Sequence, residues 1–470
     1  MTIDYEAEIS KRDQQIAELL ERIQKLEEEI KRLKKLLADK AASKKSKKPK
    51  FSLNYSVDKN SLQHQRGKKA TGRQPQEKKL GLVNTTETVY PPNSEAAACV
   101  IHRQQYAWRI IDGQAQYVCY EIYGEPDCRE LPAVPGLRNS RSEYGLEIIL
   151  VLAFLHYWIG LSIDHACEVL QFFTGLELSK SQANALLNQL SQDWTEEYDT
   201  IAQLLAIALV IYIDETGWKV GKQNCYTWAF STAMHVLFRC GVSRSKQEAQ
   251  EILGEKFAGI GVSDDYKAYE QLFEEHQLCW AHLLRKAIKL MLENPDQAEY
   301  EKFFKELLAI YQQAVSYQKD QRLSTGRCQK AEQLQAQIVK LCSRAGEAID
   351  KETTSVPEAT FIRLQNELVN HLDSLFVFVE HPEVEPTNNR SEGNVRREAE
   401  IRKGGRTSKT EQGAKRRSII MTVLASLNTR FKKFTLNDLL AEVKSWMEMG
   451  CSIFKLELSR LEQANAPPVT

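Results

Sequence analysis

Residues 207–218 read IALVIYIDETGW, and this stretch decides the fold. Its first seven residues are apolar and mostly aliphatic or β-branched, which is typical of a central strand that is buried on both faces. The turn-forming sequence DETG follows, so we predict that the strand ends at Ile213. In open α/β sheets, ligands bind just beyond the strand ends. A carboxylate held there opposes folding unless something pairs with it, so Asp214 requires partners elsewhere in the chain.

The chain after Asp214 changes between strand and helix patterns. The expected elements are, in order, strands at 226–230 and 235–239, a helix at 246–253, a strand at 259–262, a short helix, a strand at 277–280 and a helix at 281–292. Gly221 is expected in the first turn. The order of these elements indicates an α/β protein with a ribonuclease H-like catalytic core.

Two more acids occupy positions comparable with that of Asp214. Asp264 follows the predicted strand at 259–262, and Glu392 lies in the first turn of a helix expected after Asn388 and Asn389. Taken singly, such acids are usually turn or solvent-facing residues. Clustered carboxylates, however, are the ligands that Mg²⁺ and Mn²⁺ prefer, and a pair of such ions about 3.5–4 Å apart promotes phosphoryl transfer.

Basic residues surround Glu392, and cations of this kind bind the phosphates of a nucleic acid. They are Arg390, Arg396, Arg397, Arg402, Lys403 and Arg406. The core is predicted in two parts, 206–292 and 386–432. A charged, helix-patterned insertion at 293–385 separates these parts, and a helical tail is expected at 433–470.

The N-terminal segment, 1–39, has the heptad pattern of a coiled coil. Ile9, Ile16, Ile23, Ile30 and Leu37 occupy the first apolar position, and Leu19, Leu26 and Leu33 occupy the second. Isoleucine and leucine in these positions favour a parallel two-stranded coil, so we expect a homodimer or a larger homo-oligomer. The alternative is a single amphipathic helix packed on its own protein.

A basic, flexible arm is predicted at 40–85. The chain has 63 basic and 63 acidic residues, but the charge is unevenly distributed, and this arm is rich in lysine and arginine. Lys44, Lys45, Lys47, Lys48 and Arg73 are the expected DNA contacts there, because basic arms bind phosphates without a fold of their own. A solubilising linker is the alternative.

Residues 86–140 are predicted to form a small β segment. A hairpin is expected at 106–122, turning at Asp112–Gly113. Cys99, His102, Cys119 and Cys128 could be remnants of a zinc site, but their spacing lacks paired ligands, so buried thiols are favoured and zinc stays uncertain.

Residues 141–205 have a helical pattern and could bind DNA. The sequence Thr174-Gly175-Leu176 and the N-cap candidate Ser179 predict two helices joined by a glycine turn. This arrangement is that of a helix-turn-helix, and a plain helical hairpin is an equal alternative.

Several protein classes are excluded by composition. The charged N-terminus has no signal-peptide pattern, and no apolar stretch reaches the length of a membrane span. Ten scattered cysteines in a long chain indicate reduced thiols, so a cytoplasmic protein without a membrane partner is expected.

Four motifs together resemble the insertion sequence 66 family of DDE transposases, over roughly residues 140–430. They are IDETGW at 213–218, VSDDYKAY at 262–269, CWAHLLRK at 279–286 and TNNRSEGNVR at 387–396. The resemblance implies that Asp214, Asp264 and Glu392 are the catalytic, metal-binding triad. Asp265 replaces the usual glycine, and Ser391 the usual alanine. The family's CWAH pattern implies that Cys279 and His282 form a wall of the active site.

The resemblance implies a bacterial DNA transposase that cleaves element ends and joins their 3′-hydroxyls to target DNA with Mg²⁺ or Mn²⁺. Its partners would be the terminal inverted repeats and target DNA, both double-stranded, at the nucleoid. The alternative is a transposase-derived DNA-binding protein without activity. Two further alternatives remain. A coiled-coil scaffold would show no salt-dependent DNA binding, and an RNA-cleaving nuclease of the same fold would differ from a transposase in its substrate preference.

Overall fold

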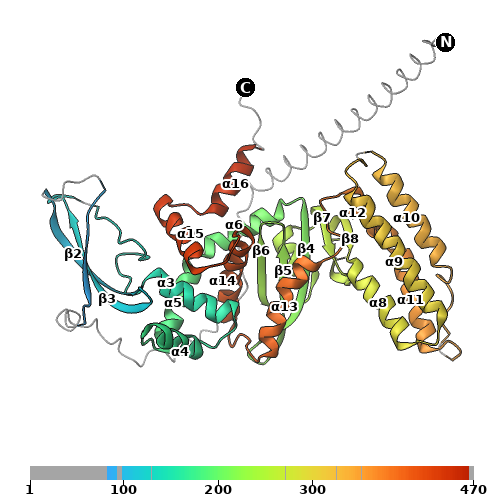
Figure 1. Ribbon diagram of the computed structural model, residues 1–470, viewed down its shortest axis with the longest axis horizontal. Helices are drawn as coiled ribbons and strands as arrows, with labels where there is room; N and C mark the ends of the chain where they lie inside the picture. The colour runs from blue at the N-terminus through green and yellow to red at the C-terminus, as the bar shows by residue number, and fades with distance from the viewer. Residues whose placement is uncertain are drawn as a thin grey trace, which may run out of the picture. The chain divides into compact units, whose positions relative to one another are not determined.

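The computed structural model describes residues 82–92, 98–128, 130–269, 271–323, 325–350 and 352–464. The predicted coiled coil at 1–39 and nearly all of the predicted basic arm, including its five expected DNA contacts, lie outside these residues. The described part mixes helices with two β-sheets (Figure 1). Within it, no helix has both the length and the hydrophobicity needed to cross a membrane.

A five-stranded sheet lies at the centre of the chain. Its elements are β4 (Val210–Val220), β5 (Gln223–Ser231), β6 (Val236–Val242), α7 (Lys246–Leu253), β7 (Phe257–Ser263), η3 (Lys267–Tyr269), β8 (Phe273–Leu278) and α8 (Trp280–Glu293). The spatial order is β6-β5-β4-β7-β8. Strands β4, β7 and β8 are parallel, and β5 is antiparallel to both of its neighbours.

The first strand differs from its prediction at both ends. Strand β4 starts at Val210, because Ile207 caps the preceding helix, and it continues six residues past Asp214. The continuation occurs because β5 folds back at Gly221 and pairs with β4 as far as Val220. Asp214 therefore lies within the strand. The predicted end of the fifth strand is also wrong, since β8 stops at Leu278 and Trp280 begins α8.

A second, three-stranded sheet has the order β1-β3-β2. Strands β2 (Val100–Ile111) and β3 (Gln114–Gly124) are the predicted hairpin, and β1 (Thr85–Val89) pairs parallel to β3. Asp112 and Gly113 both have positive φ angles, 50° and 77°, which is the conformation of a type I′ turn. The predicted turn is confirmed, and both strands are longer than expected.

Helices fill the segment between the two sheets. They are α3 (Leu146–Ala153), the π-helix η2 (Phe154–Trp158), α4 (Ile163–Thr174), α5 (Lys180–Asp193) and α6 (Thr195–Ala206). Gly175 ends α4 with a φ of 75°, and Ser179 starts α5 with a reciprocal hydrogen-bond pair to Gln182. The predicted glycine turn and N-cap are confirmed.

Helix α14 (Glu411–Arg430) covers the open edge of the sheet beside β6 (Figure 1). Three of its hydroxyl side chains, spaced four residues apart, accept hydrogen bonds from alternate N–H groups of β6. Ser418 accepts from Cys240 at 2.9 Å, Thr422 from Phe238 at 2.9 Å and Ser426 from Val236 at 3.0 Å. An edge strand that would otherwise present free N–H groups is thereby closed.

A buried ion pair joins α14 to α13 (Asn389–Lys403). Arg417 forms two hydrogen bonds of 2.7 and 2.8 Å with Glu398, whose side chain is fully buried. The same guanidinium donates to the carbonyl of Tyr157 and lies 4.8 Å from the ring centre of Trp218. This charge pair thus joins α13 to α14, and Arg417 also connects both helices to η2 and to β4.

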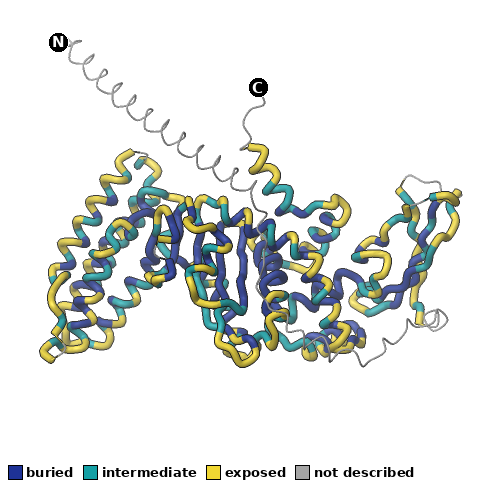
Figure 2. Tube along the Cα trace, turned by 180° about the vertical axis from the view of Figure 1, so that it is seen from behind, coloured by how far each residue is buried: buried dark blue, intermediate teal, exposed yellow. Residues whose placement is uncertain are grey.

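The chain between α8 and α13 is helical. It contains α9 (Ala298–Lys319), α10 (Arg327–Leu341), α11 (Val356–Asn370), η4 (Leu372–Ser374) and α12 (Val377–Glu380). Their apolar faces form one core with Tyr212, Ile260 and Val262 of the sheet. Figure 2 shows that the strands of the five-stranded sheet are mostly buried and that exposed residues lie along the outer sides of these helices.

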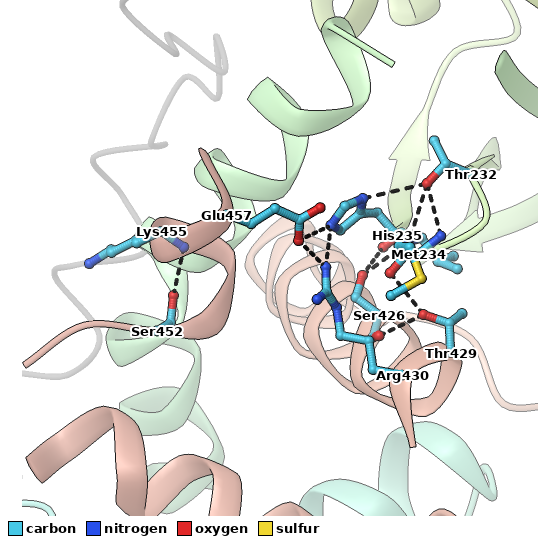
Figure 3. Close-up of polar contacts among 10 residues, drawn as sticks. Thr232, Met234, His235, Ser426, Thr429, Arg430, Ser452, Lys455 and Glu457 are labelled. Carbon is cyan, nitrogen blue, oxygen red and sulfur yellow. Dashed lines mark hydrogen bonds and ion pairs between the residues drawn. The ribbon is translucent and has the colours of Figure 1, made fainter. Parts of the chain in front are cut away.

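The last helices, α15 (Leu436–Met449) and α16 (Ile453–Ala464), follow α14. A polar cluster attaches α16 to the sheet (Figure 3). In it, Arg430 of α14 donates to Glu457 of α16 and to His235 in the β5–β6 connection. His235 is buried, and burial lowers its pKa, so the neutral ring accepts this bond.

Replacement of Thr422 by valine tests the contact between α14 and β6. The variant keeps the shape but leaves the N–H of Phe238 buried without an acceptor, which should lower the free energy of unfolding by about 1–3 kcal/mol. Thr360→Val on α11 is the matched control, because that exposed hydroxyl bonds only to its own helix. Urea denaturation of both variants measures the difference, and equal stabilities would contradict the proposed edge closure.

Candidate active site

Asp214 lies within β4, and Asp264 directly follows the neighbouring parallel strand β7. The last paired residues of β4 and β7 are Tyr212 and Val262. Asp214 lies two residues after Tyr212, and Asp264 lies two residues after Val262. Asp214 Oδ1 accepts a hydrogen bond of 2.9 Å from the N–H of Glu215, and Asp264 Oδ1 accepts one of 3.1 Å from Tyr266. The register therefore brings the two aspartates to the same edge of the sheet, close enough for the charge of Asp264 to act on Asp214.

Glu392 reaches the same region from α13, after the helical insertion. The segment before it is tied to the core by backbone and side-chain bonds: Trp280 N–H donates to Pro386 at 3.0 Å, and Asn388 Nδ2 donates to the carbonyl of Ile213 at 2.7 Å. Ser391 Oγ donates to the carbonyl of Ala229 at 2.9 Å. These bonds fix the first turn of α13 beside the residue that precedes Asp214.

The electrostatic state of Asp214 reflects this crowding. Burial and the charge of Glu215, with smaller contributions from Asp264 and Glu392, raise the pKa of Asp214 to about 7. Among the described residues, neither Asp214 nor Asp264 forms an ion pair with a lysine, arginine or histidine. Two adjacent carboxylates without a cation form an arrangement that suits a divalent ion.

The carboxylate of Glu392 faces α8. Its Oε1 lies 3.1 Å from Arg285 Nη2, 3.4 Å from His282 Nδ1 and 3.7 Å from the thiol of Cys279. Over the described residues, only Cys279, His282 and Glu392 bring three potential ligand atoms within 4.8 Å of one another. The predicted triad thus shares one electrostatic environment, but its three carboxylates are not gathered into one such cluster.

The donor chemistry of Asp214 and Asp264 fits Mg²⁺ or Mn²⁺, because both ions prefer carboxylate oxygens. Burial and the neighbouring acids raise the pKa of Asp214, and a nearby positive charge would favour the ionised form that they disfavour. Glu392 would complete the set only after its carboxylate turns away from Arg285.

Three residues near the acids were not identified from the sequence. Glu215 has a nearly buried side chain that pairs with Arg244 at 2.6 Å and accepts a hydrogen bond from the hydroxyl of Tyr269. Arg285 binds Glu392. Lys286 bridges Asp265 at 2.9 Å and Glu367 of α11 at 2.7 Å. The adjacent cations in CWAHLLRK and the second acid in DETG were the available indications.

The six cations predicted around Glu392 fall into two groups. Three are used within the protein: Arg390 pairs with Glu385, Arg397 stacks 3.9 Å from the ring centre of Trp158, and Arg402 donates to the carbonyl of Gly217. Arg396, Lys403 and Arg406 are exposed and form no ion pair with any described residue. Only the second group is free to meet a phosphate.

The possible zinc ligands near the N-terminus do not converge. Cys128 Sγ lies 3.7 Å from His102 Nε2, and that nitrogen is already 2.8 Å from the carbonyl of Glu125. Cys119 is buried within β3. Over the described residues, Cys99, His102, Cys119 and Cys128 contribute no group of three ligand atoms within 4.8 Å, so the geometry favours ordinary thiols.

The Asp214→Asn variant tests whether the negative charge of Asp214 destabilises the folded protein. An aspartate with a pKa near 3.9 when unfolded and about 7 when folded loses stability as the pH rises between these values. Without divalent ions, the variant should therefore be more stable than wild type at pH 8, by at most about 4 kcal/mol, and similar near pH 4. Thermal unfolding across this range is the measurement.

Asp127→Asn is the control, since this aspartate is exposed in a loop and its change should alter stability by less than about 0.5 kcal/mol at either pH. The raised pKa of Asp214 would be contradicted if the wild-type protein became more stable, relative to the Asp214→Asn variant, as the pH increased from 4 to 8.

A family model described as Transposase IS66 family matches residues 141–416, which is more than half of the chain. The matched range contains Asp214, Asp264, Glu392 and the helical insertion between the two parts of the site. No curated protein matches the chain.

Proposed function

Because the chain belongs to the IS66 transposase family, we propose that it is a DDE-type DNA transposase that cleaves the ends of its element and joins their 3′-hydroxyls to target DNA. The observation that carries the proposal is the placement of Asp214 within β4 and of Asp264 directly after the adjacent parallel strand β7. Glu392 lies within their electrostatic range.

The catalytic core is proposed to be ribonuclease H-like. The supporting feature is the sheet, whose strands in chain order occupy the spatial order 3-2-1-4-5 with the second strand antiparallel. The helices of 293–385 enter between α8 and α13, at the point where the chain leaves the sheet. In this arrangement the insertion separates the third acid from the first two in sequence, while Glu392 stays near enough for its charge to act on Asp214.

Asp214, Asp264 and Glu392 are the proposed ligands of Mg²⁺ or Mn²⁺. When bound, the ions would activate the attacking oxygen and stabilise the leaving oxygen at phosphorus. The remaining work of the chain is positioning: β4 and β7 hold two carboxylates at a fixed spacing, and α13 presents the third. Arg285 would release Glu392 and become available to a DNA phosphate.

DNA contacts are proposed for the exposed cations of the α13 region. Arg396, Lys403 and Arg406 lie on the same helix as Glu392 or just after it, so a bound phosphate backbone would pass close to the acids. The helix pair α4–α5 and the basic arm at 40–85 are proposed to bind the terminal inverted repeats. The heptads at 1–39 are proposed to hold a homodimer or a larger homo-oligomer together.

The catalytic proposal is tested with DNA that carries the element ends. Asp214→Asn, Asp264→Asn and Glu392→Gln should each reduce Mg²⁺-dependent cleavage and strand transfer by at least about 100-fold, because each removes a ligand that acts in the transition state. Gel assays of cleavage and joining are the measurement, with a binding assay on the same DNA alongside.

Asp127→Asn serves as the matched acid control and should retain full activity, since it is exposed and distant in sequence from the motifs. Unchanged DNA binding in the three inactive variants would separate a catalytic role from a folding defect. Full activity of all three would refute the assignment, and binding without cleavage by wild type would favour the inactive DNA-binding alternative.

The proposed phosphate-binding role of these cations is tested by the salt dependence of DNA binding. Changing Arg396, Lys403 and Arg406 together to glutamine should weaken binding and reduce the slope of log affinity against log salt concentration by about 0.9 for each phosphate that is no longer neutralised. Lys302→Gln on α9, which removes another exposed charge, should leave the slope unchanged. A triple variant with the wild-type slope would place the DNA elsewhere.

A further inference from the structure

Three different donor atoms meet at the beginning of α8. Cys279 directly precedes the helix, His282 lies in its first turn, and Glu392 comes from the first turn of α13. The Cys279 sulfur, a ring nitrogen of His282 and a carboxylate oxygen of Glu392 all lie within 4.8 Å of one another. The sequence shows only the CxxH pair, because the third donor is more than one hundred residues away in the chain.

The spacing of these atoms matches the edges of a tetrahedral metal site. Zinc bonds of about 2.3 Å to sulfur and about 2.0–2.1 Å to nitrogen or oxygen imply ligand separations of about 3.5 Å for sulfur–oxygen and about 3.3 Å for nitrogen–oxygen. The observed separations are 3.7 Å from Cys279 Sγ to Glu392 Oε1 and 3.4 Å from His282 Nδ1 to the same oxygen. The third separation, from Cys279 Sγ to the ring nitrogen of His282, is at most 4.8 Å, so a bound ion would draw these two atoms together by up to about 1.3 Å.

Two buried polar atoms at this place have no hydrogen-bond partner. One is His282 Nδ1, which lies near Glu392 without the geometry of a hydrogen bond. The other is Oδ1 of Asn388, whose backbone N–H donates to Cys279 Sγ at 3.2 Å. Buried polar atoms are normally paired, so a ring nitrogen without a hydrogen bond, beside a thiol and a carboxylate, is available to bind a ligand.

We infer that Cys279, His282 and Glu392 bind one thiophilic divalent cation of the Zn²⁺ class. Sulfur and imidazole ligands select Zn²⁺ and related transition metals over Mg²⁺, which prefers oxygen. Three protein ligands leave the fourth tetrahedral position open to water. The N–H of Asn388 donates to Cys279 Sγ at 3.2 Å and would remain a hydrogen-bond partner of the metal-bound sulfur.

Arg285 is compatible with this site. Its side chain is 56% exposed, so the guanidinium can withdraw from Glu392 into solvent, or keep the outer carboxylate oxygen while the other binds the ion. Bound metal would tie α8 to α13 across the helical insertion. Since it would also occupy Glu392, the site would compete with the proposed Mg²⁺ ligands, a consequence that rests on the proposed function.

Cobalt(II) titration of the full-length, metal-free protein tests the binding site without any DNA. Thiolate ligation gives an intense charge-transfer absorption, which should saturate at one equivalent, resist a large excess of Mg²⁺ and disappear when Zn²⁺ is added. Cys279→Ser should lose this absorption, and His282→Gln and Glu392→Gln should each weaken Co²⁺ affinity at least tenfold. Zn²⁺ should also raise the melting temperature of wild type but not of Cys279→Ser.

Cys328→Ser is the control, because Cys328 is exposed on α10 and should leave the titration unchanged. Absence of the thiolate absorption in wild type, or its persistence in Cys279→Ser, would overturn the inference. If Cys279→Ser does not fold, a Glu392→Gln titration identical to that of wild type would overturn it equally. Loss of transposition activity alone would bear on the proposed function and leave this result untouched.

Discussion

Asn388 is the residue through which the chain returns to its sheet after the helical insertion. Its side-chain amide donates to the carbonyl of Ile213, and its backbone N–H donates to Cys279 Sγ. One buried residue therefore joins β4, the start of α8 and the start of α13. The position of Glu392 depends on this junction, because the helical insertion separates α13 from α8 in the chain and Asn388 ties the two together again.

Polar contacts then determine how the last part of the chain packs. The hydroxyls of Ser418, Thr422 and Ser426 match the spacing of alternate residues in β6, so α14 can lie along that edge in only one register. The buried pair of Glu398 and Arg417 imposes a similar condition between α13 and α14, since a slip of either helix would leave a charge buried alone. These contacts therefore restrict how α13 and α14 can pack against the sheet and against each other.

The acids of the site, in contrast, are placed where they lower the stability of the metal-free fold. Asp214 is held beside Glu215 and Asp264, and the raised pKa of Asp214 records the free energy that this proximity costs the metal-free fold. Glu392 is stabilised differently, by Arg285 and by the donors of α8. The third carboxylate thus has two sets of possible partners, one of oxygen ligands and one containing sulfur and nitrogen, and a choice between them would change the metal that the site binds.

The sequence by itself determined several local elements, and it supplied the three acids that are proposed as metal ligands. Apolar runs, the Asp112–Gly113 turn and the Ser179 cap depend on neighbouring residues only, and they were predicted correctly. The end of β4 was not, because Asp214 to Val220 stay extended only through pairing with β5. Tertiary structure also decided which arginines are free and placed Glu392 beside Cys279 and His282, since contacts between distant segments leave no periodic pattern in the chain.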